Sequence, residues 1–493
     1  MKQYFSDFFS VSPKVLDAYG AFNISLISDL PLFIDPFLLF NSKKKSYQKL
    51  HDEIIKYIKF LRDRSADASL DDGAINVWFR FPEIKQNWFG FSVGDNRGSG
   101  LGRDFAKALH ANLHKVFHDF GEETVTQGSH IEKLCLISNG VGRDNISDFT
   151  TNLIHGFLLN YTQQFAKKHI KAKFRKTIPV GKARFNYKTE TWEAKSYDLP
   201  FNNGDYVLLT PKDILTRDET WINKSDYNNN FEVIIQSVTN DALRTEINNY
   251  FYKVLEKDRK TKEPKETKKA KSEAAARTYQ QFPELVDYYL KYKEDNGDKA
   301  VDISSEKVQT SQQLYVEQFK QLAVKLNKTT DFYKKYPDTL EEARKRVEWL
   351  KDVIENKDGY RIFYRDNGEH IDREQDLQIL FALTWFASES DVNREVNNGR
   401  GPVDFKVSRG SKDKSLVEFK LAKNTQLERN LENQLKVYEA ANNTKKSLTV
   451  ILFLSEDELI RVQAILRRLE LTEEKDIVLI DARNDNKPSA SKA

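Results

Sequence analysis

Two strand-like runs separated by a polar turn place the strongest constraint on how this chain folds. They are PVDFKVS (402–408) and LVEFKLA (416–422), joined by RGSKDKS (409–415). Apolar and polar residues alternate in both runs, and this period of two is typical of strands that pair as a hairpin. We therefore predict a hairpin whose apolar face is formed by Val403, Phe405, Val407, Val417, Phe419 and Leu421.

The segments around the hairpin complete an α/β pattern. The expected order is helix, strand, hairpin, helix, strand, helix and strand, over 372–390, 392–396, 402–422, 426–442, 447–455, 456–471 and 476–482. The run SLTVILFLS (447–455) is apolar throughout. Because such a run is typical of a strand covered on both faces, we expect it at the centre of a mixed sheet.

The polar face of the hairpin carries two acids and one base. Glu418 and Lys420 are two residues apart on one strand, so they point to the same face, and Asp404 can share that face from the other strand. An ordinary solvent-exposed sheet face shows the same alternation and is the simpler alternative. Phosphodiester hydrolysis, however, requires this kind of set: a few carboxylate oxygens for a divalent cation and a basic group beside the attacking water.

This arrangement resembles the PD-(D/E)XK nuclease superfamily, which has the restriction-endonuclease-like fold. The motif is Pro402-Val403-Asp404, then thirteen residues, then Glu418-Phe419-Lys420. One residue separates Pro402 from Asp404, whereas the family pattern has an adjacent Pro-Asp. The resemblance covers about 370–485, roughly a quarter of the chain. It implies a Mg²⁺-dependent nuclease in which Mn²⁺ can substitute.

The resemblance also implies a role for each matching residue. Asp404, Glu418 and the main-chain carbonyl of Phe419 would bind the metal, and Lys420 would position or deprotonate the attacking water. Gln434-x-x-x-Tyr438 on the following helix is similar to the RecB-like branch, and Glu374 opens the preceding helix, where members often supply another acid. Ordinary helix chemistry is the alternative for these three residues, because an acid in a first turn also favours the helix dipole.

DNA rather than RNA is the substrate that the resemblance implies. A bacterial enzyme of defence against foreign DNA is the expected role, by analogy at the level of fold. Two alternatives stay open: a DNA repair or recombination nuclease, and a non-catalytic nucleic-acid-binding scaffold that keeps the fold. A partner ATPase or helicase, another defence subunit and assembly into a homo-oligomer also stay open.

Composition gives little further guidance about partners. The chain has 78 Lys and Arg against 74 Asp and Glu, a net charge of +4, so any basic surface must be local. A single cysteine, Cys135, excludes an internal disulfide and indicates a reducing compartment. The most apolar stretch, 27–40, contains two Asp and two Pro. We therefore expect a cytoplasmic protein with neither a secretory signal nor a membrane span.

The chain is expected to be α/β overall and to divide into five segments. They are an α+β recognition or regulatory domain (1–255), a charged linker (256–278), a helical connecting segment (279–365), the nuclease-like domain (366–485) and a disordered tail (486–493). Within the first domain we predict a helix over 46–64, strands over 75–81, 87–93 and 132–138, and a hairpin over 182–200.

Two other groups in the first domain are candidate sites. His110, His114 and His118 recur every four residues, but no metal-ligand pattern such as H-E-x-x-H is present, so a solvated helix face is favoured. Asp144, Asn145 and Asp148 lie at a strand–helix junction, where helix capping explains them well.

Overall fold

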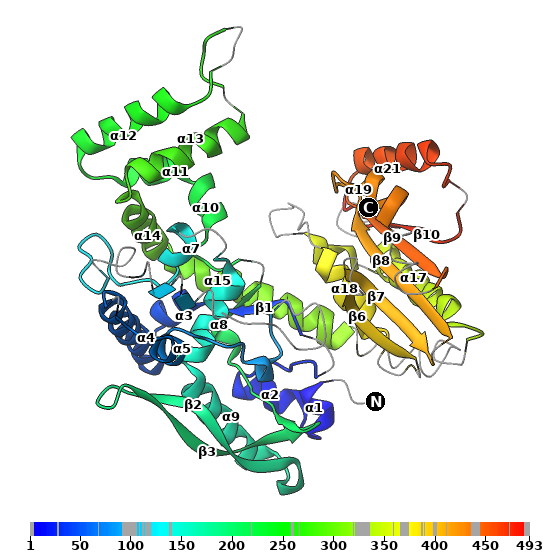
Figure 1. Cartoon of the computed structure of the whole chain (residues 1–493), viewed down its shortest axis with the longest axis horizontal. Helices are drawn as coiled ribbons and strands as arrows, with labels where there is room; N and C mark the ends of the chain where they lie inside the picture. Colours follow the sequence, from blue (N-terminus) through cyan, green and yellow to red (C-terminus); the bar gives the residue numbers. More distant parts are fainter. Residues whose placement is uncertain are drawn as a thin grey trace.

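The computed structural model has two lobes, one holding the first part of the chain and the other the C-terminal sheet (Figure 1). The structure describes residues 4–26, 29–67, 69–90, 106–107, 109–110, 113, 120–137, 141–217, 219–257, 261–265, 267–318, 320, 336–357, 359–364, 374–385, 388, 390–397, 402–410, 412–434, 444–472 and 474–487. Within them, no helix is both long and apolar enough to cross a bilayer.

The N-terminal lobe is mostly helical. Its helices up to residue 254 are α1 (Phe5–Phe8), α2 (Pro13–Tyr19), α3 (Pro36–Phe40), α4 (Lys45–Ser65), α5 (Asp72–Trp78), η1 (Lys85–Asn87), α7 (Lys133–Ile137), α8 (Arg143–Leu153), α9 (His155–His169), η2 (Ala172–Phe174), η3 (Lys212–Ile214), α10 (Lys224–Asn229), α11 (Phe231–Ser237) and α12 (Asp241–Val254). The predicted helix 46–64 is confirmed as α4, which buries an apolar stripe that includes Ile54, Ile58 and Leu61.

The described part of this lobe also holds two small sheets. The predicted hairpin 182–200 is confirmed as β2 (Arg175–Asn186) and β3 (Thr191–Asn202), which pair antiparallel. The short β4 (Asp205–Tyr206) pairs with the other edge of β3. β1 (Leu32–Ile34) pairs antiparallel with β5 (Leu215–Arg217).

Two of the predicted strands are wrong. Residues 75–78 belong to α5 and 133–137 to α7, so these parts of the predicted strands 75–81 and 132–138 are helical. Asp71 starts α5, because its side chain accepts a hydrogen bond from the Ala74 N–H at 2.7 Å. Short apolar runs fit a buried helix turn as well as a strand, and in α5 the cap favours the helix. The predicted strand 87–93 contributes only an isolated bridge of Phe89 with Leu30 within its described part.

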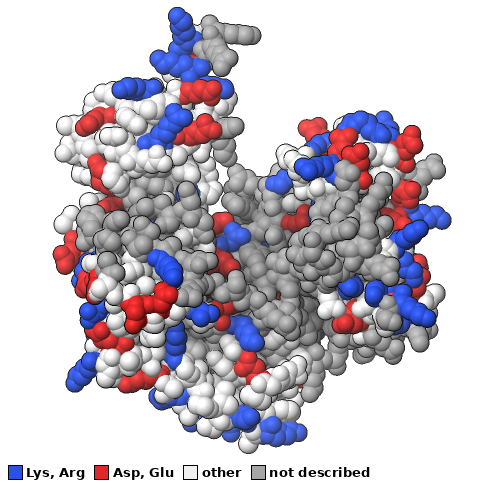
Figure 2. All heavy atoms as spheres, in the orientation of Figure 1, with Lys and Arg blue, Asp and Glu red and all other residues white. Residues whose placement is uncertain are grey.

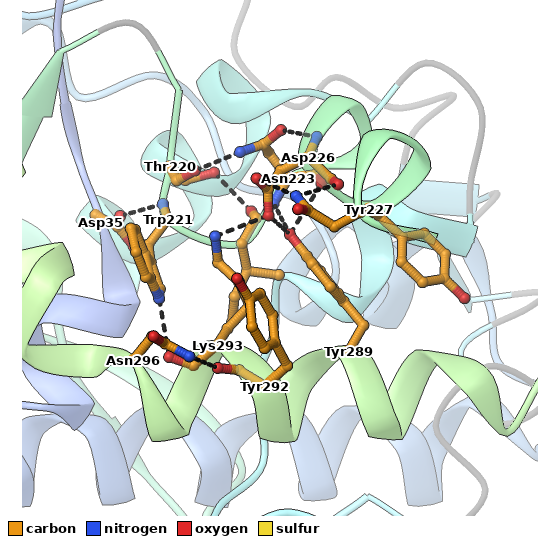
Figure 3. Close-up of polar contacts among 12 residues, drawn as sticks. Asp35, Thr220, Trp221, Asn223, Asp226, Tyr227, Tyr289, Tyr292, Lys293 and Asn296 are labelled. Carbon is orange, nitrogen blue, oxygen red and sulfur yellow. Dashed lines mark hydrogen bonds and ion pairs between the residues drawn. The ribbon is translucent and has the colours of Figure 1, made fainter. Parts of the chain in front are cut away.

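Further helices of the N-terminal lobe follow in the chain: α13 (Lys268–Gln281), α14 (Leu285–Asp295), α15 (Gly297–Ser311) and the π-helix η4 (Gln312–Gln318). α13 begins inside the stretch predicted as a charged linker, where the Thr267 side chain accepts a hydrogen bond from the Ala270 N–H. Figure 3 shows how α14 is anchored: Lys293 pairs with Asp226 at 2.8 Å and lies 3.7 Å over the Trp221 ring. Buried polar contacts therefore fix this helix against residues 220–227.

The C-terminal lobe is built on a five-stranded mixed sheet in the order β10-β9-β8-β7-β6. Its strands are β6 (Asp391–Asn397), β7 (Pro402–Arg409), β8 (Asp413–Leu421), β9 (Ser447–Phe453) and β10 (Ile477–Asp481). β6, β7 and β8 pair antiparallel, whereas β8, β9 and β10 pair parallel. The predicted strands 392–396, 402–408, 416–422, 447–455 and 476–482 are confirmed, and every residue of β9 is buried, as expected for its apolar run.

Helices cover both faces of this sheet. α17 (Thr339–Asn356), η5 (Gly359–Phe363) and α18 (Glu374–Leu383) lie on one side, and α19 (Leu427–Arg429), η6 (Asn430–Gln434) and α21 (Glu456–Arg468) on the other. Phe381 of α18 contacts the rings of Phe405 and Phe419, with centroids 5.0 and 5.1 Å away. Most of the predicted apolar face thus joins the main core, while Val403 packs separately with Leu416. α17 lies in the predicted connecting segment yet packs against β7, β8, β9 and β10.

A buried polar contact joins the lobes. Arg217 at the end of β5 reaches Asp376 on α18, with Nη2 3.5 Å from Oδ2, and donates a hydrogen bond to the Ile362 carbonyl at 2.9 Å. The Tyr315 hydroxyl donates to the same carboxylate at 3.2 Å. Arg217 and Asp376 are 4% and 0% exposed, so solvent does not screen this pair.

Candidate active site at the fork of the C-terminal sheet

The central sheet splits between β7 and β8. Their ladder runs from Arg409↔Asp413 to Phe405↔Val417 and ends there. Beyond that point β7 stays paired with β6 as far as Asn397↔Pro402, and β8 stays paired with β9 as far as Leu421↔Leu452. The two strands therefore part at Asp404 and Glu418, and we call this place the fork.

The two acids at the fork replace the missing ladder. The Asp404 N–H donates a hydrogen bond to Glu418 Oε2 at 3.2 Å, and the Phe419 N–H donates to Asp404 Oδ2 at 2.6 Å. Each carboxylate thus caps a backbone group that the neighbouring strand no longer satisfies. These reciprocal bonds hold Asp404 and Glu418 side by side, as the sequence predicted for this hairpin face.

Lys420 and Glu374 complete the group. Lys420 Nζ lies 2.7 Å from Glu418 Oε1 and 3.7 Å from Oε1 of Glu374, the first residue of α18. Glu418 is 5% exposed and Lys420 is 8% exposed. The alternative of an ordinary solvent-exposed sheet face is therefore wrong for these two residues. Four of the predicted site residues converge, although they come from three elements.

Burial and mutual repulsion shape the titration of this group. Burial raises the pKa of Asp404 to about 8, and the neighbouring Glu418 acts in the same direction. Burial also raises the pKa of Glu374, against the opposing effect of Lys420. Burial alone would lower the pKa of Lys420, but the three carboxylates together raise it above its ordinary value. The fork therefore holds more acid than one lysine neutralises, which favours an added cation.

The donor set suits a hard cation that keeps part of its water. Among the described residues, no group of three or more His, Cys, Asp or Glu side chains is placed to bind a metal by itself. The fork instead brings together two adjoining carboxylates, those of Asp404 and Glu418, beside the backbone of Phe419. Mg²⁺ commonly binds through one or two carboxylates and retains several waters, so these residues fit it.

Two predicted residues cannot be placed at the fork. Gln434 is the last residue of η6, but its side chain lies outside the described part of the chain. Tyr438 also lies outside the described residues. The structure thus neither brings the predicted Gln-x-x-x-Tyr pair to the site nor separates it from the site.

Asp376, the buried acid two residues after Glu374, was missed from the sequence. Its partners Arg217 and Tyr315 lie far away in the chain, so no local spacing could have indicated the contact. An acid in the apolar stretch EQDLQILFAL was the one available signal, because a buried carboxylate needs a partner.

Among the other candidate groups, His110 and Asn145 have structural roles, whereas burial and the nearby Asp144, Glu83 and Asp29 raise the pKa of Asp148 to about 8. His110 Nε2 lies 3.1 Å from the Asp67 carbonyl, and the His110 ring contacts Phe79. His114 and His118 lie outside the described residues. Asn145 accepts a hydrogen bond from the Gly142 N–H at 2.9 Å, which caps α8. Helix capping, as predicted, accounts for Asn145.

Two sequence families match parts of the chain. A domain of unknown function, DUF8370, matches residues 10–223, and a second, DUF8371, matches residues 339–456. No curated protein and no solved structure matches the chain. The second match starts at the first residue of α17 and includes Glu374, Asp404, Glu418 and Lys420. Helix α17 and the fork thus belong to one recurring sequence unit.

Proposed function

We propose that the C-terminal lobe is a Mg²⁺-dependent nuclease and that the fork is its active site. The observation that carries the proposal is the reciprocal pair of hydrogen bonds that locks Asp404 and Glu418 together beside Lys420. A sheet face with a purely structural role does not require two buried acids side by side, because burying charge is costly. A cation that binds both carboxylates offsets this cost.

Asp404, Glu418 and the main-chain carbonyl of Phe419 would hold the metal. When bound, it would polarise the phosphoryl oxygen and lower the pKa of the attacking water. Lys420 stays charged, because its pKa is raised, so it acts by orienting the water and offsetting phosphate charge rather than as a base. Glu374 holds Lys420 from the other side and is a positioning residue.

DNA is the substrate class that the resemblance to PD-(D/E)XK nucleases supports, and defence against foreign DNA is the role proposed by analogy. The choice between DNA and RNA rests on that resemblance alone. The substrates of the first test should therefore include supercoiled plasmid, single-stranded DNA and RNA.

The proposal is tested by cation binding and cleavage with the purified full chain. Calorimetry should detect Mn²⁺ binding to the wild type, and Asp404→Asn should weaken it at least about tenfold, because one ligand charge is removed. Asp391→Asn, on the edge strand β6, is the matched control and should bind as the wild type does. Equal Mn²⁺ affinity of Asp404→Asn and the wild type, or no cleavage of any of the three substrates, would overturn the proposal.

A further inference from the structure

A strongly basic segment lies in the N-terminal lobe, away from the fork. Residues 167–176, KKHIKAKFRK, contain six Lys or Arg and no Asp or Glu, in a chain whose net charge is only +4. The segment runs from the last turn of α9 through η2 into β2. Its five lysines, Lys167, Lys168, Lys171, Lys173 and Lys176, are all exposed. We call residues 167–176 the basic segment.

These lysines have no carboxylate partners within the described part of the chain. Among the residues that the structure describes, Arg175 is the one of these six cations that forms an ion pair, with Asp198 at 2.6 Å. Lys176 Nζ lies 4.7 Å over the Phe201 ring and Lys173 Nζ 5.0 Å over the Phe174 ring. Aromatic faces hold these two side chains without neutralising them, so their charge remains available to an external anion.

Structural roles account for only part of the segment. Lys167 and Lys168 lie in the last turn of α9, where cations complement the helix dipole. Lys171, Lys173 and Lys176 lie beyond that helix and gain nothing from it. In Figure 2, Lys and Arg side chains gather at the lower end of this lobe, where Figure 1 places α9 and the β2–β3 hairpin.

We infer that the basic segment is a docking surface for the phosphate backbone of duplex DNA. The inference rests on the proposed function, because a nuclease must hold a polyanion and the fork itself is acidic. Clustered, unpaired lysines on one surface are the electrostatic footprint of phosphate binding. A membrane is the less fitting partner, since the exposed large apolar residues of the described chain lie elsewhere, at Val77, Val233, Tyr252, Val301, Ile303 and Ile460.

The test is equilibrium binding of a fluorescein-labelled duplex to the full chain, measured by fluorescence anisotropy in EDTA so that no cleavage occurs. The variant replaces Lys168, Lys171, Lys173 and Lys176 with Ala. The control replaces Lys14, Lys43, Lys45 and Lys49, which are exposed on α2 and near the start of α4, and removes the same charge. Thermal melting of both variants shows whether they fold.

The variant should bind at least about tenfold more weakly than the control. The slope of the logarithm of its affinity against the logarithm of the salt concentration should be shallower by about 0.9 for each phosphate that a lysine no longer neutralises. A Lys→Arg version of the same four positions should restore binding. Equal affinity of variant and control, or weaker binding only to anionic phosphatidylserine vesicles while duplex binding is unchanged, would overturn the inference. Duplex binding that depends on the basic segment, without any Mg²⁺-dependent cleavage, would contradict the proposed nuclease function and leave the docking surface in place.

Discussion

At the scale of single residues, the two buried acids of the fork have a definable structural role. At the fork, a carboxylate stands in for a strand partner, so Asp404 and Glu418 are both structural caps and candidate ligands. Elsewhere, buried acids have no such double role. Glu132 is fully buried beside Asp35 and His130.

Glu132 should make the stability of the N-terminal lobe pH-dependent. Burial raises its pKa from the ordinary 4.5 to about 7, with Asp35 acting in the same direction and His130 against it. The folded state binds the Glu132 proton more tightly than the unfolded state does. The stabilisation that the protonated Glu132 gives the folded state is therefore greatest below pH 4.5 and is lost as the pH rises through 7. The change in the free energy of unfolding caused by Glu132→Gln should therefore be more favourable at about pH 8 than at about pH 5, by about 1–3 kcal/mol.

Thermal melts at the two pH values measure this difference. Glu284→Gln, at an exposed position, is the control and should leave the pH dependence as in the wild type. A Glu132→Gln melting temperature that follows the wild type at both pH values would contradict the assignment.

At the scale of elements, buried ion pairs lock α17 onto the sheet. Glu342 accepts hydrogen bonds from Arg346 on its own helix at 2.6 Å and from Arg409 of β7 at 2.8 Å. Ser388 and Ser390 donate to the same carboxylate. Arg346 is fully buried and lies 4.3 Å over the Trp385 ring. Glu342 thus connects α17 with β7 and with the segment that holds Ser388 and Ser390.

Removal of this carboxylate should be costly. Glu342→Ala should destabilise the C-terminal lobe by about 3–5 kcal/mol, because Arg346 stays buried without its ion-pair partner. Glu348→Ala, which breaks a solvent-exposed pair on the same helix, should cost less than about 1 kcal/mol. Urea unfolding of the two variants provides the comparison, and a similar destabilisation in both would show that Glu342 contributes no more than a surface pair.

The strands of the C-terminal lobe and the splitting of its sheet differ in how far the sequence predicts them. The strands of the C-terminal lobe were predictable, because alternation in 402–408 and a continuous apolar run in 447–455 each fit one kind of strand. The convergence of Asp404, Glu418 and Lys420 followed from strand periodicity. The splitting of the sheet at these residues did not, since it depends on which neighbouring strands each one keeps.

The N-terminal errors have a different cause. The runs 75–81 and 132–138 are too short for periodicity to separate a helix from a strand, and contacts distant in the chain decide the outcome. In α7, for example, Cys135 is buried and its sulfur lies 3.9 Å from the Ile222 carbonyl. No spacing within the run carries that information.

At the scale of the whole molecule, the contact of Arg217 and Tyr315 with Asp376 links the N-terminal lobe to α18, the helix that carries Glu374. Asp376→Asn removes the charge that Arg217 faces. We expect faster amide hydrogen exchange in both β5 and α18, because the buried pair is no longer held by opposite charges. Hydrogen-exchange mass spectrometry measures both segments at once.

Asp391→Asn on β6 is a suitable control, since this residue is exposed and its side chain contacts the neighbouring Asn393. It should leave exchange in β5 unchanged. If Asp376→Asn increases the exchange rate in α18 but not in β5, the contact does not couple the two lobes and acts only within the C-terminal lobe.

The most direct test of the central claim is the rate of Mg²⁺-dependent plasmid cleavage by Lys420→Ala, compared with Lys475→Ala, an exposed position next to β10. If the fork is the active site, Lys420→Ala should be slower than wild type by about 10²–10³-fold, as is typical when a group that stabilises charge in the transition state is removed. Lys475→Ala should cleave at the wild-type rate. Cleavage by Lys420→Ala at the wild-type rate would contradict the account.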